Sequence, residues 1–221
     1  MADTPLTYES AGVNIDEAQR TLRNVSAAIK STYTPAVTAG IGGFGSLFQL
    51  DLSAYQRPLL VTSIDGVGTK TRVASMAGKY DGLGKDIVNH CVNDILCQGA
   101  QPLYFLDYFG TSKLEPEIFE AIVTSMADAC KEIGIALVGG ETAELPGVYT
   151  TSEFDVVGTI VGIVDADLKY PRAKASPGDS LIGIFSSGLH TNGYSLARRA
   201  LFDVGGLTVN DTVPGVGTTI G

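Results

Sequence analysis

One carboxylate, two glycines and one lysine lie close together in segment 63–70, which reads SIDGVGTK. An apolar, β-branched run precedes this segment and a helix-compatible run follows it, so it occupies a turn between a strand and a helix. Such a turn can present backbone N–H groups to an anion, while a carboxylate at the strand end holds a metal ion. Asp65 and Lys70 are therefore candidates for binding a metal–phosphate complex. Taken alone, the octapeptide favours a simpler interpretation, a tight turn with a capping aspartate.

Further carboxylates follow at glycine-marked ends of predicted elements. Asp94, preceded by Asn93, lies near the end of a predicted helix, and Glu141 and Glu144 follow a buried strand that ends in two glycines. Several separated carboxylates, glycine turns and one lysine suit a Mg²⁺–nucleotide site, because Mg²⁺ prefers oxygen ligands and offsets triphosphate charge. His90 shares the polar face of the predicted helix with Asp94, but a single histidine there indicates little.

A glycine-rich segment at 40–45 has the formal pattern G-x-G-x-x-G. It does not fit a dinucleotide-binding fingerprint, because segment 46–50 looks like a strand where that motif requires a helix. A lid over a phosphate and a mobile hairpin both remain open for it. Segment 66–71 is no Walker A loop either, since no glycine directly precedes Lys70.

Strands and helices alternate along most of the chain. A helix is predicted from Asn14 to Tyr33, with apolar residues spaced by three and four, and further helices at 71–77, 84–99 and 116–133. Buried strands are predicted at 58–62, 102–109, 135–144 and 154–165. This order predicts an α/β (α+β) domain with a mixed sheet and flanking helices.

The last quarter of the chain looks different. Segment 170–178 looks like a linker and is followed by a predicted strand at 181–185, a polar glycine turn at 186–193 and a helix at 194–204. About fifty residues are few for an independent domain. We therefore divide the chain into domain 1–170 and the beginning of a second α/β domain at 171–221.

Composition excludes several classes of function. The 221 residues have a net charge of −9 without a Lys/Arg run, which argues against nucleic acid and anionic membrane partners. No apolar run reaches the ~18 residues of a membrane span, and the N-terminus is no signal peptide. Three cysteines without a metal-binding spacing look like reduced core thiols, so we expect a cytoplasmic protein.

These motifs together resemble the phosphoribosylformylglycinamidine cyclo-ligases, or AIR synthetases, of purine biosynthesis. The matching stretches occur in family order and cover the chain from residue 8 to about residue 200. They are YESAGV at 8–13, IGGFG at 41–45, DGVGTK at 65–70, CVNDI at 91–95, GAQPLYFLDY at 99–108, GGETAE at 139–144 and SSGLHTNGYSL at 186–196.

The resemblance implies an enzyme that uses ATP and Mg²⁺ to close the imidazole ring of formylglycinamidine ribonucleotide. It also implies a homodimer in which the N-terminal sheets of two chains form a barrel. By similarity, the metal ligands are Asp65, Asp94 and Glu141, and the catalytic candidates are Lys70 and His190. The resemblance also assigns nucleotide or substrate binding to Gly42, Gly43, Gly45, Asp65, Gly66, Gly68, Thr69, Lys70, Asn93, Asp94, Asp107 and Glu141.

Other functions remain as alternatives. One is a different ATP-dependent phosphotransferase of the same superfamily, such as a thiamine-phosphate kinase or a selenophosphate synthetase. Another is a non-catalytic dimerisation module, because members of the resembled family continue well past residue 221. The least favoured is a dinucleotide-binding protein built on segment 40–45.

Overall fold

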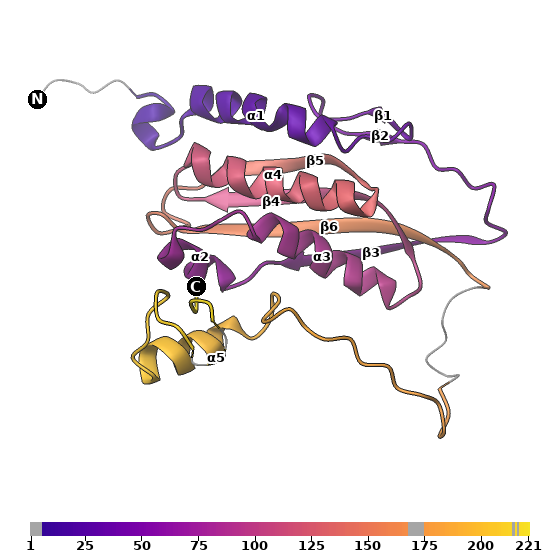
Figure 1. The fold of residues 1–221 in the computed structure, drawn as a ribbon. Helices are drawn as coiled ribbons and strands as arrows, with labels where there is room; N and C mark the ends of the chain where they lie inside the picture. Colours follow the sequence, from indigo (N-terminus) through magenta and orange to yellow (C-terminus); the bar gives the residue numbers. More distant parts are fainter. Residues whose placement is uncertain (1–5, 168–174, 214, 216) are drawn as a thin grey trace, which may run out of the picture.

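The computed structural model describes residues 6–167, 175–213, 215 and 217–221 (Figure 1). In chain order its elements are η1 (Glu9–Ala11), α1 (Ile15–Lys30), β1 (Val37–Ala39), β2 (Leu47–Phe48), β3 (Pro58–Gly66), α2 (Lys70–Ala77), α3 (Leu83–Leu96), β4 (Gln101–Thr111), α4 (Pro116–Ile133), β5 (Ala136–Glu144), β6 (Phe154–Asp165), α5 (Tyr194–Arg198) and the π-helical turn η3 (Arg199–Val204).

Four strands form one mixed sheet in the order β3-β6-β4-β5. β6 pairs antiparallel with both β3 and β4, whereas β4 and β5 are parallel and are connected through α4. The mixed sheet with flanking helices confirms the predicted α/β (α+β) class. β1 and β2 form a separate antiparallel hairpin around the glycine segment 40–45.

The helix ends follow local chemistry. The side chain of Asn14 accepts a hydrogen bond from the Glu17 N–H, so it caps α1 as predicted, and α1 ends three residues before the predicted end. α4 begins with Pro116 and is followed by the C-cap Gly134, whose φ of +83° is the left-handed conformation that glycine adopts at low cost.

Helices α3 and α4 pack on one face of the sheet, and α1 lies against α4 and the edge strand β5 (Figure 1). Phe105 and Phe109 point from β4 into this layer and are almost fully buried. The Phe109 ring meets Phe119 of α4 edge-on at 5.2 Å and stacks on Phe154 of β6 at 5.6 Å. The core therefore lies between the sheet and these helices.

Strand β3 differs from its predicted burial. The sequence predicts a buried strand, but β3 is an edge strand, and Leu60 and Ile64 are 58% and 68% exposed. Side chains alternate between the two faces of a strand, so these two point away from the helices while Ser63 and Asp65 point toward α3. The sequence pattern correctly marked a strand but could not show that one of its faces lies open.

The predicted strand at 181–185 is wrong. This segment is irregular, and Leu181, Ile182, Ile184 and Phe185 are each at least 90% exposed. A strand needs a hydrogen-bonded neighbour, and no described segment pairs with this one. The helix expected at 194–204 is present as α5 and η3. The predicted linker begins within 168–174, outside the described residues, so the domain division there stays a prediction.

The three cysteines are unpaired. Cys91 and Cys130 are buried as expected, and burial raises the pKa of each thiol to about 12, which keeps it neutral. Cys97 is exposed and so departs from the expected core position. In the described part of the chain, no helix is both long and apolar enough to cross a membrane.

Candidate functional site

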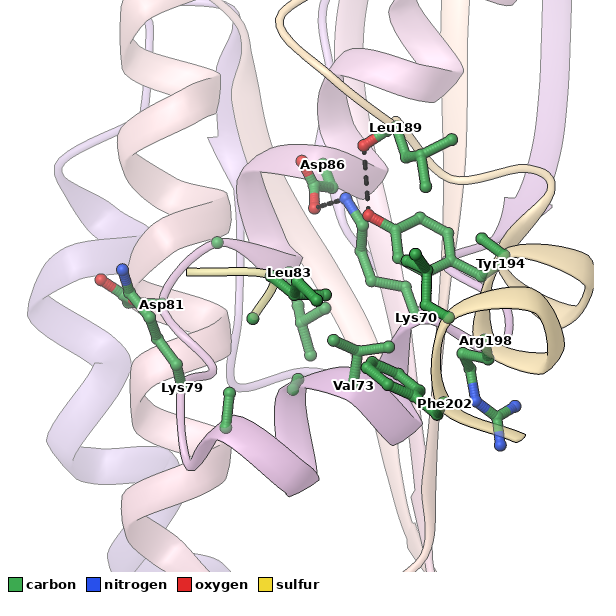
Figure 2. Close-up of a pocket in the computed structure, with 17 residues that line it drawn as sticks. Lys70, Val73, Lys79, Asp81, Leu83, Asp86, Leu189, Tyr194, Arg198 and Phe202 are labelled. Atoms are coloured by element: carbon green, nitrogen blue, oxygen red, sulfur yellow. Dashed lines mark hydrogen bonds and ion pairs between the residues drawn. The ribbon is translucent and has the colours of Figure 1, made fainter. Parts of the chain in front are cut away.

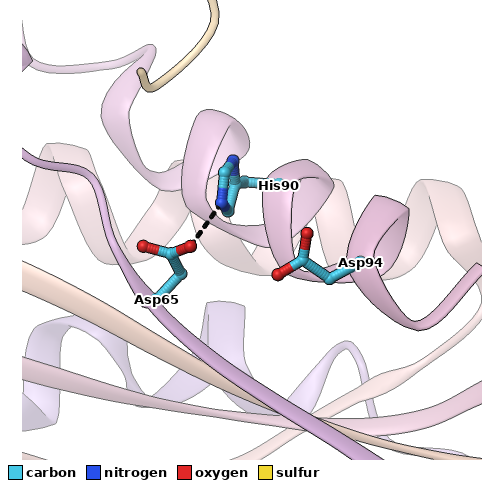
Figure 3. Close-up of side chains that lie close together, drawn as sticks. All are labelled: Asp65, His90 and Asp94. Carbon is cyan, nitrogen blue, oxygen red and sulfur yellow. Dashed lines mark hydrogen bonds and ion pairs between the residues drawn. The ribbon is translucent and has the colours of Figure 1, made fainter. Parts of the chain in front are cut away.

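Three side chains that can bind a metal ion meet beside the end of β3. One ligand atom from each of Asp65, His90 and Asp94 lies within 4.8 Å of the other two (Figure 3). Asp65 belongs to β3, whereas His90 and Asp94 are four residues apart on α3 and therefore share one helix face. The structure thus brings together two of the three residues that the resemblance assigns to a metal, and it adds His90.

Hydrogen bonds orient both carboxylates. The Gly66 N–H donates to Asp65 Oδ1 at 2.7 Å, and His90 Nε2 lies 2.6 Å from Asp65 Oδ2. Ser63 Oγ donates to Asp94 Oδ2 at 2.8 Å. The Asp65 side chain is still 42% exposed, so an ion or a ligand can reach its carboxylate from solvent.

This donor set fits a hard divalent cation. The two carboxylates offer oxygen atoms that keep free lone pairs beside the hydrogen bonds they accept. Mg²⁺ typically takes one or two protein carboxylates and keeps several waters, and the exposure of this group leaves room for them. Asp65 and Asp94 are the residues that would hold the ion.

The glycine segment forms the rim of a second site. It covers a cavity of about 750 Å³ that also receives Asp107 and Glu141. The segment is fixed at both ends, because Ile41 N–H donates to the Tyr33 hydroxyl at 2.8 Å and Ser46 Oγ donates to the Val138 carbonyl at 2.5 Å. It is thus a hairpin loop over β5 rather than the start of a helix, which excludes the dinucleotide-binding fingerprint.

Asp107 is the unusual carboxyl group of this cavity. Burial raises its pKa from 3.8 to about 7, and hydrogen bonding to its own backbone lowers it only in part. Among the described residues, no cation forms an ion pair with it. Gly140 lets the carboxyl group fit, because a Cβ atom there would lie 2.1 Å from Asp107 Oδ1. A group with this pKa exchanges a proton near neutral pH.

Lys70 lines a different cavity, of about 450 Å³, between α2, the beginning of α3 and the C-terminal helix α5 (Figure 2). Its Nζ forms an ion pair with Asp86 and lies 5.0 Å from the centroid of the Tyr194 ring. Tyr194 is fixed in turn by a hydrogen bond from its hydroxyl to the Leu189 carbonyl at 3.2 Å. The charge of Lys70 is thus offset by that of Asp86. Lys70 and the glycine loop line two different cavities.

Within one chain, Glu141 does not join the cluster of Asp65, His90 and Asp94, which we call the Asp65 group. It lies on β5, at the opposite edge of the sheet from β3. Three strand spacings of roughly 4.8 Å separate these edges by about 14 Å. The three carboxylates that the resemblance assigns to a metal therefore divide between two places, with Asp65 and Asp94 at one and Glu141 at the other.

The polar turn 186–193 touches the Asp65 group through Thr191, whose hydroxyl hydrogen-bonds His90 Nδ1. The catalytic candidate His190 instead lies 3.3 Å from Ser186 Oγ within the same turn. Thr69, another assigned residue, meets Ser195 of α5 at 3.1 Å. The role of His90 in this cluster was not predicted, although its four-residue spacing from Asp94 places both side chains on one helix face.

Comparison with known proteins gives these sites a context. Residues 51–164, just over half of the chain, match the family described as "AIR synthase related protein, N-terminal domain". The chain belongs to this family. Its curated relatives include proteins named phosphoribosylformylglycinamidine cyclo-ligase from Geotalea uraniireducens (47% identity over 220 residues) and Alkaliphilus metalliredigens (49% over 221 residues). The matches cover 100% of this chain but only 63% and 64% of those relatives.

Solved structures show the same AIR synthase related fold at lower identity. Thiamine-monophosphate kinase from Stenotrophomonas maltophilia matches with a TM-score of 0.60 and 18% identity, over 88% of this chain and 56% of the kinase. The hydrogenase maturation protein HypE, in complex with ATP, matches with a TM-score of 0.52 and 24% identity, over 73% of this chain and 44% of HypE. At these identities, the likeness extends to the fold.

Proposed function

We propose that this chain is the N-terminal, ATP-binding part of a phosphoribosylformylglycinamidine cyclo-ligase. The supporting observation is the 47–49% identity to proteins of that name along the whole chain. The reaction is the ATP- and Mg²⁺-dependent closure of formylglycinamidine ribonucleotide to aminoimidazole ribonucleotide, a step of purine biosynthesis. A cytoplasmic location belongs to the same proposal.

The proposed reaction turns a poor leaving group into a good one. The terminal phosphoryl group of ATP is transferred to the formyl oxygen of the substrate, which releases ADP. The internal nitrogen then attacks the same carbon, the carbon–oxygen bond breaks, and phosphate leaves as the ring closes. Because this attack is intramolecular, correct orientation provides much of the rate gain. The protein must therefore hold two anionic ligands in register and offset their charge.

The glycine-loop cavity is the proposed nucleotide site. Its volume of about 750 Å³ lies within the usual range of small-molecule pockets. Arg23 and Lys30 of α1 line it together with Asp107 and Glu141, so it offers cations for phosphates and acceptors for a base or a ribose. HypE, which shares the fold, was solved in complex with ATP, and this supports ATP as the ligand of the proposed site.

The Asp65–Asp94 pair is the proposed Mg²⁺ site. A Mg²⁺ ion there would neutralise the charge of a phosphate group that lies beside this pair, at the opposite edge of the sheet from the glycine-loop cavity. The hydrogen bonds from Gly66 and Ser63 hold the carboxylates in place before the ion binds. Turn 186–193 lies on the substrate side in this proposal, because Thr191 reaches the same group. Domain 1–170 then binds ATP, and segment 171–221 begins the second domain.

A second copy of this chain is the proposed partner on the open face of the sheet. Leu60 and Ile64 are exposed there on β3, and pairing two such faces would remove them from water. We expect Ile64→Lys to convert a dimer into a monomer in light scattering. Leu96→Lys is the matched control, because Leu96 is 61% exposed but lies at the end of α3. A monomeric wild-type chain would contradict this part of the proposal.

Single-turnover ADP release tests the activity. The assay mixes the chain with ATP, Mg²⁺ and formylglycinamidine ribonucleotide, and an Asp65→Asn variant serves as the control. ADP that forms only with substrate, and is lost in the variant, would support the cyclo-ligase. A folded chain that releases no ADP above background would show that this segment lacks the activity and would favour the dimerisation module. Release with thiamine monophosphate instead would favour a kinase of the same fold.

A further inference from the structure

His90 connects two segments that are far apart in the sequence. Its Nε2 lies 2.6 Å from Asp65 Oδ2, and its Nδ1 contacts the hydroxyl of Thr191, 101 residues further along the chain. The His90 side chain is only 14% exposed, and Thr191 is 5% exposed. Both contacts are thus partly buried, which strengthens each hydrogen bond.

The partners of the ring fix its tautomer. An ionised carboxylate only accepts hydrogen bonds, so Asp65 requires a proton on Nε2. In the neutral ring Nδ1 is then an acceptor, and the Thr191 hydroxyl must donate to it. With its proton on Nε2, His90 donates to Asp65 and has no lone pair there for a metal ion.

Asp65 is consequently held at both oxygens, by the Gly66 N–H at Oδ1 and by His90 at Oδ2. A carboxylate that is 42% exposed would otherwise rotate freely in solvent. Holding it in one orientation lowers the entropy cost of binding a cation or a phosphate–cation complex.

We propose that His90 is a positioning residue: it orients Asp65, and Thr191, by donating to Nδ1, holds the ring in place for that contact. Turn 186–193 is thereby coupled to the proposed Mg²⁺ carboxylate without touching it. The role given to Asp65 rests on the proposed function, whereas the tautomer and the coupling rest on the geometry alone.

Four variants separate positioning from simple packing. Thr191→Val removes the hydroxyl and keeps the shape, and Thr191→Ser keeps the hydroxyl. His90→Leu removes both ring nitrogens, whereas the side-chain amide of His90→Gln can still donate to Asp65 and accept from Thr191. Urea denaturation of each variant shows whether it remains folded under the assay conditions.

The first measurement is the ¹⁵N spectrum of the imidazole rings of the whole chain at pH 8. The chain has two histidines, and a His190→Gln background leaves His90 as the only signal. We expect the Nε2–H tautomer in wild type and in both Thr191 variants, because Asp65 remains. We expect the Nδ1 resonance to shift only in Thr191→Val, which loses the hydrogen bond that Thr191 donates. An Nδ1–H tautomer in wild type, or an unchanged spectrum in Thr191→Val, would overturn the proposal.

The second measurement is Mn²⁺ affinity, read from the free-ion signal in electron paramagnetic resonance, with Mn²⁺ as the probe for the Mg²⁺ site. Loss of an outer-shell partner typically weakens metal binding about 10- to 100-fold, so we expect His90→Leu to fall in this range. We expect His90→Gln to restore most of the affinity and Thr191→Val to lower it without touching either carboxylate. Equal affinities of the Leu and Gln variants would overturn the positioning role.

The two proposals fail in distinguishable ways. A wild-type chain that binds no Mn²⁺ would overturn the metal role of Asp65 in the proposed function, and the imidazole spectrum would then decide the positioning role by itself. Normal Mn²⁺ binding with the wrong tautomer would overturn the role of His90 and leave the proposed function intact.

Discussion

Replacing Asp107 by asparagine removes a carboxyl group whose ionisation opposes folding. Burial raises its pKa from 3.8 to about 7 in the folded protein, whereas the unfolded chain keeps the ordinary value. Between pH 4 and pH 7 the folded state therefore holds a proton that the unfolded state has released. The free energy of unfolding contributed by this group falls as the pH rises through this range.

The size of the effect follows from the two pKa values. A rise from 3.8 to about 7 corresponds to about 4 kcal/mol, which is an upper bound. Asp107 lines the glycine-loop cavity, so water reaches its carboxyl group and reduces the cost of ionising it. We therefore expect Asp107→Asn to gain about 1–3 kcal/mol in free energy of unfolding, relative to wild type, between pH 5 and pH 8.

Urea denaturation of both proteins at each pH from 5 to 8 measures this difference. Asp128→Asn is the matched control, because Asp128 is an exposed carboxylate on α4, 62% exposed and 3.6 Å from Lys131. We expect the control to follow wild type closely. A difference between Asp107→Asn and wild type that stays constant, or shrinks as the pH rises, would show that burial does not raise the pKa of Asp107.

Two further predictions concern the framework of the fold. Gly84 lies where α3 crosses α4, and a Cβ atom there would lie 2.1 Å from the Ile122 carbonyl oxygen, so we expect Gly84→Ala to lose about 1–3 kcal/mol in urea denaturation. Gly82→Ala is its control, since nothing lies within 4 Å of a Cβ atom at that position, and an equal loss in both would contradict the close-packing argument. Asn14→Ala removes the cap of α1 and should cost about 0.5–2 kcal/mol, measured in the same way. Asn14→Asp should keep most of the stability, and a similar loss in both Asn14 variants would show that the cap contributes little.

Part of the candidate site could be predicted from sequence because it depends on local chemistry. The spacing of four between His90 and Asp94 fixes one helix face, and the run that ends at Asp65 fixes the end of a strand. Which carboxylates meet depends on strand order, and no local pattern contains that information. The order β3-β6-β4-β5 places Asp65 and Glu141 at opposite edges of the sheet, although both follow strands and lie near glycines.

Which apolar segments become buried strands is also not predictable from local sequence. The apolar residues of β3 and of segment 181–185 gave nearly the same signal, a short run that fits a buried strand. In the structure β3 pairs along its whole length with β6 and exposes one face, whereas 181–185 has no described neighbour and is not a strand. A strand exists only when another strand satisfies its backbone groups, so its formation depends on residues remote in sequence.

Local patterns along the chain predict the class of the fold, the principal helices, the four strands of the sheet and the glycine loop, and they mark the candidate site residues. Hydrophobic periodicity and turn-forming residues depend on a few neighbouring positions, so they can be recognised directly in the sequence. Tertiary contacts bring Asp65, Thr191 and His90 into one connected group and pair Lys70 with Asp86. They also shield Asp107 without an ion pair to any cation of the described residues. These outcomes depend on contacts between distant segments, and the free energies of burial and pairing arise only when those segments meet.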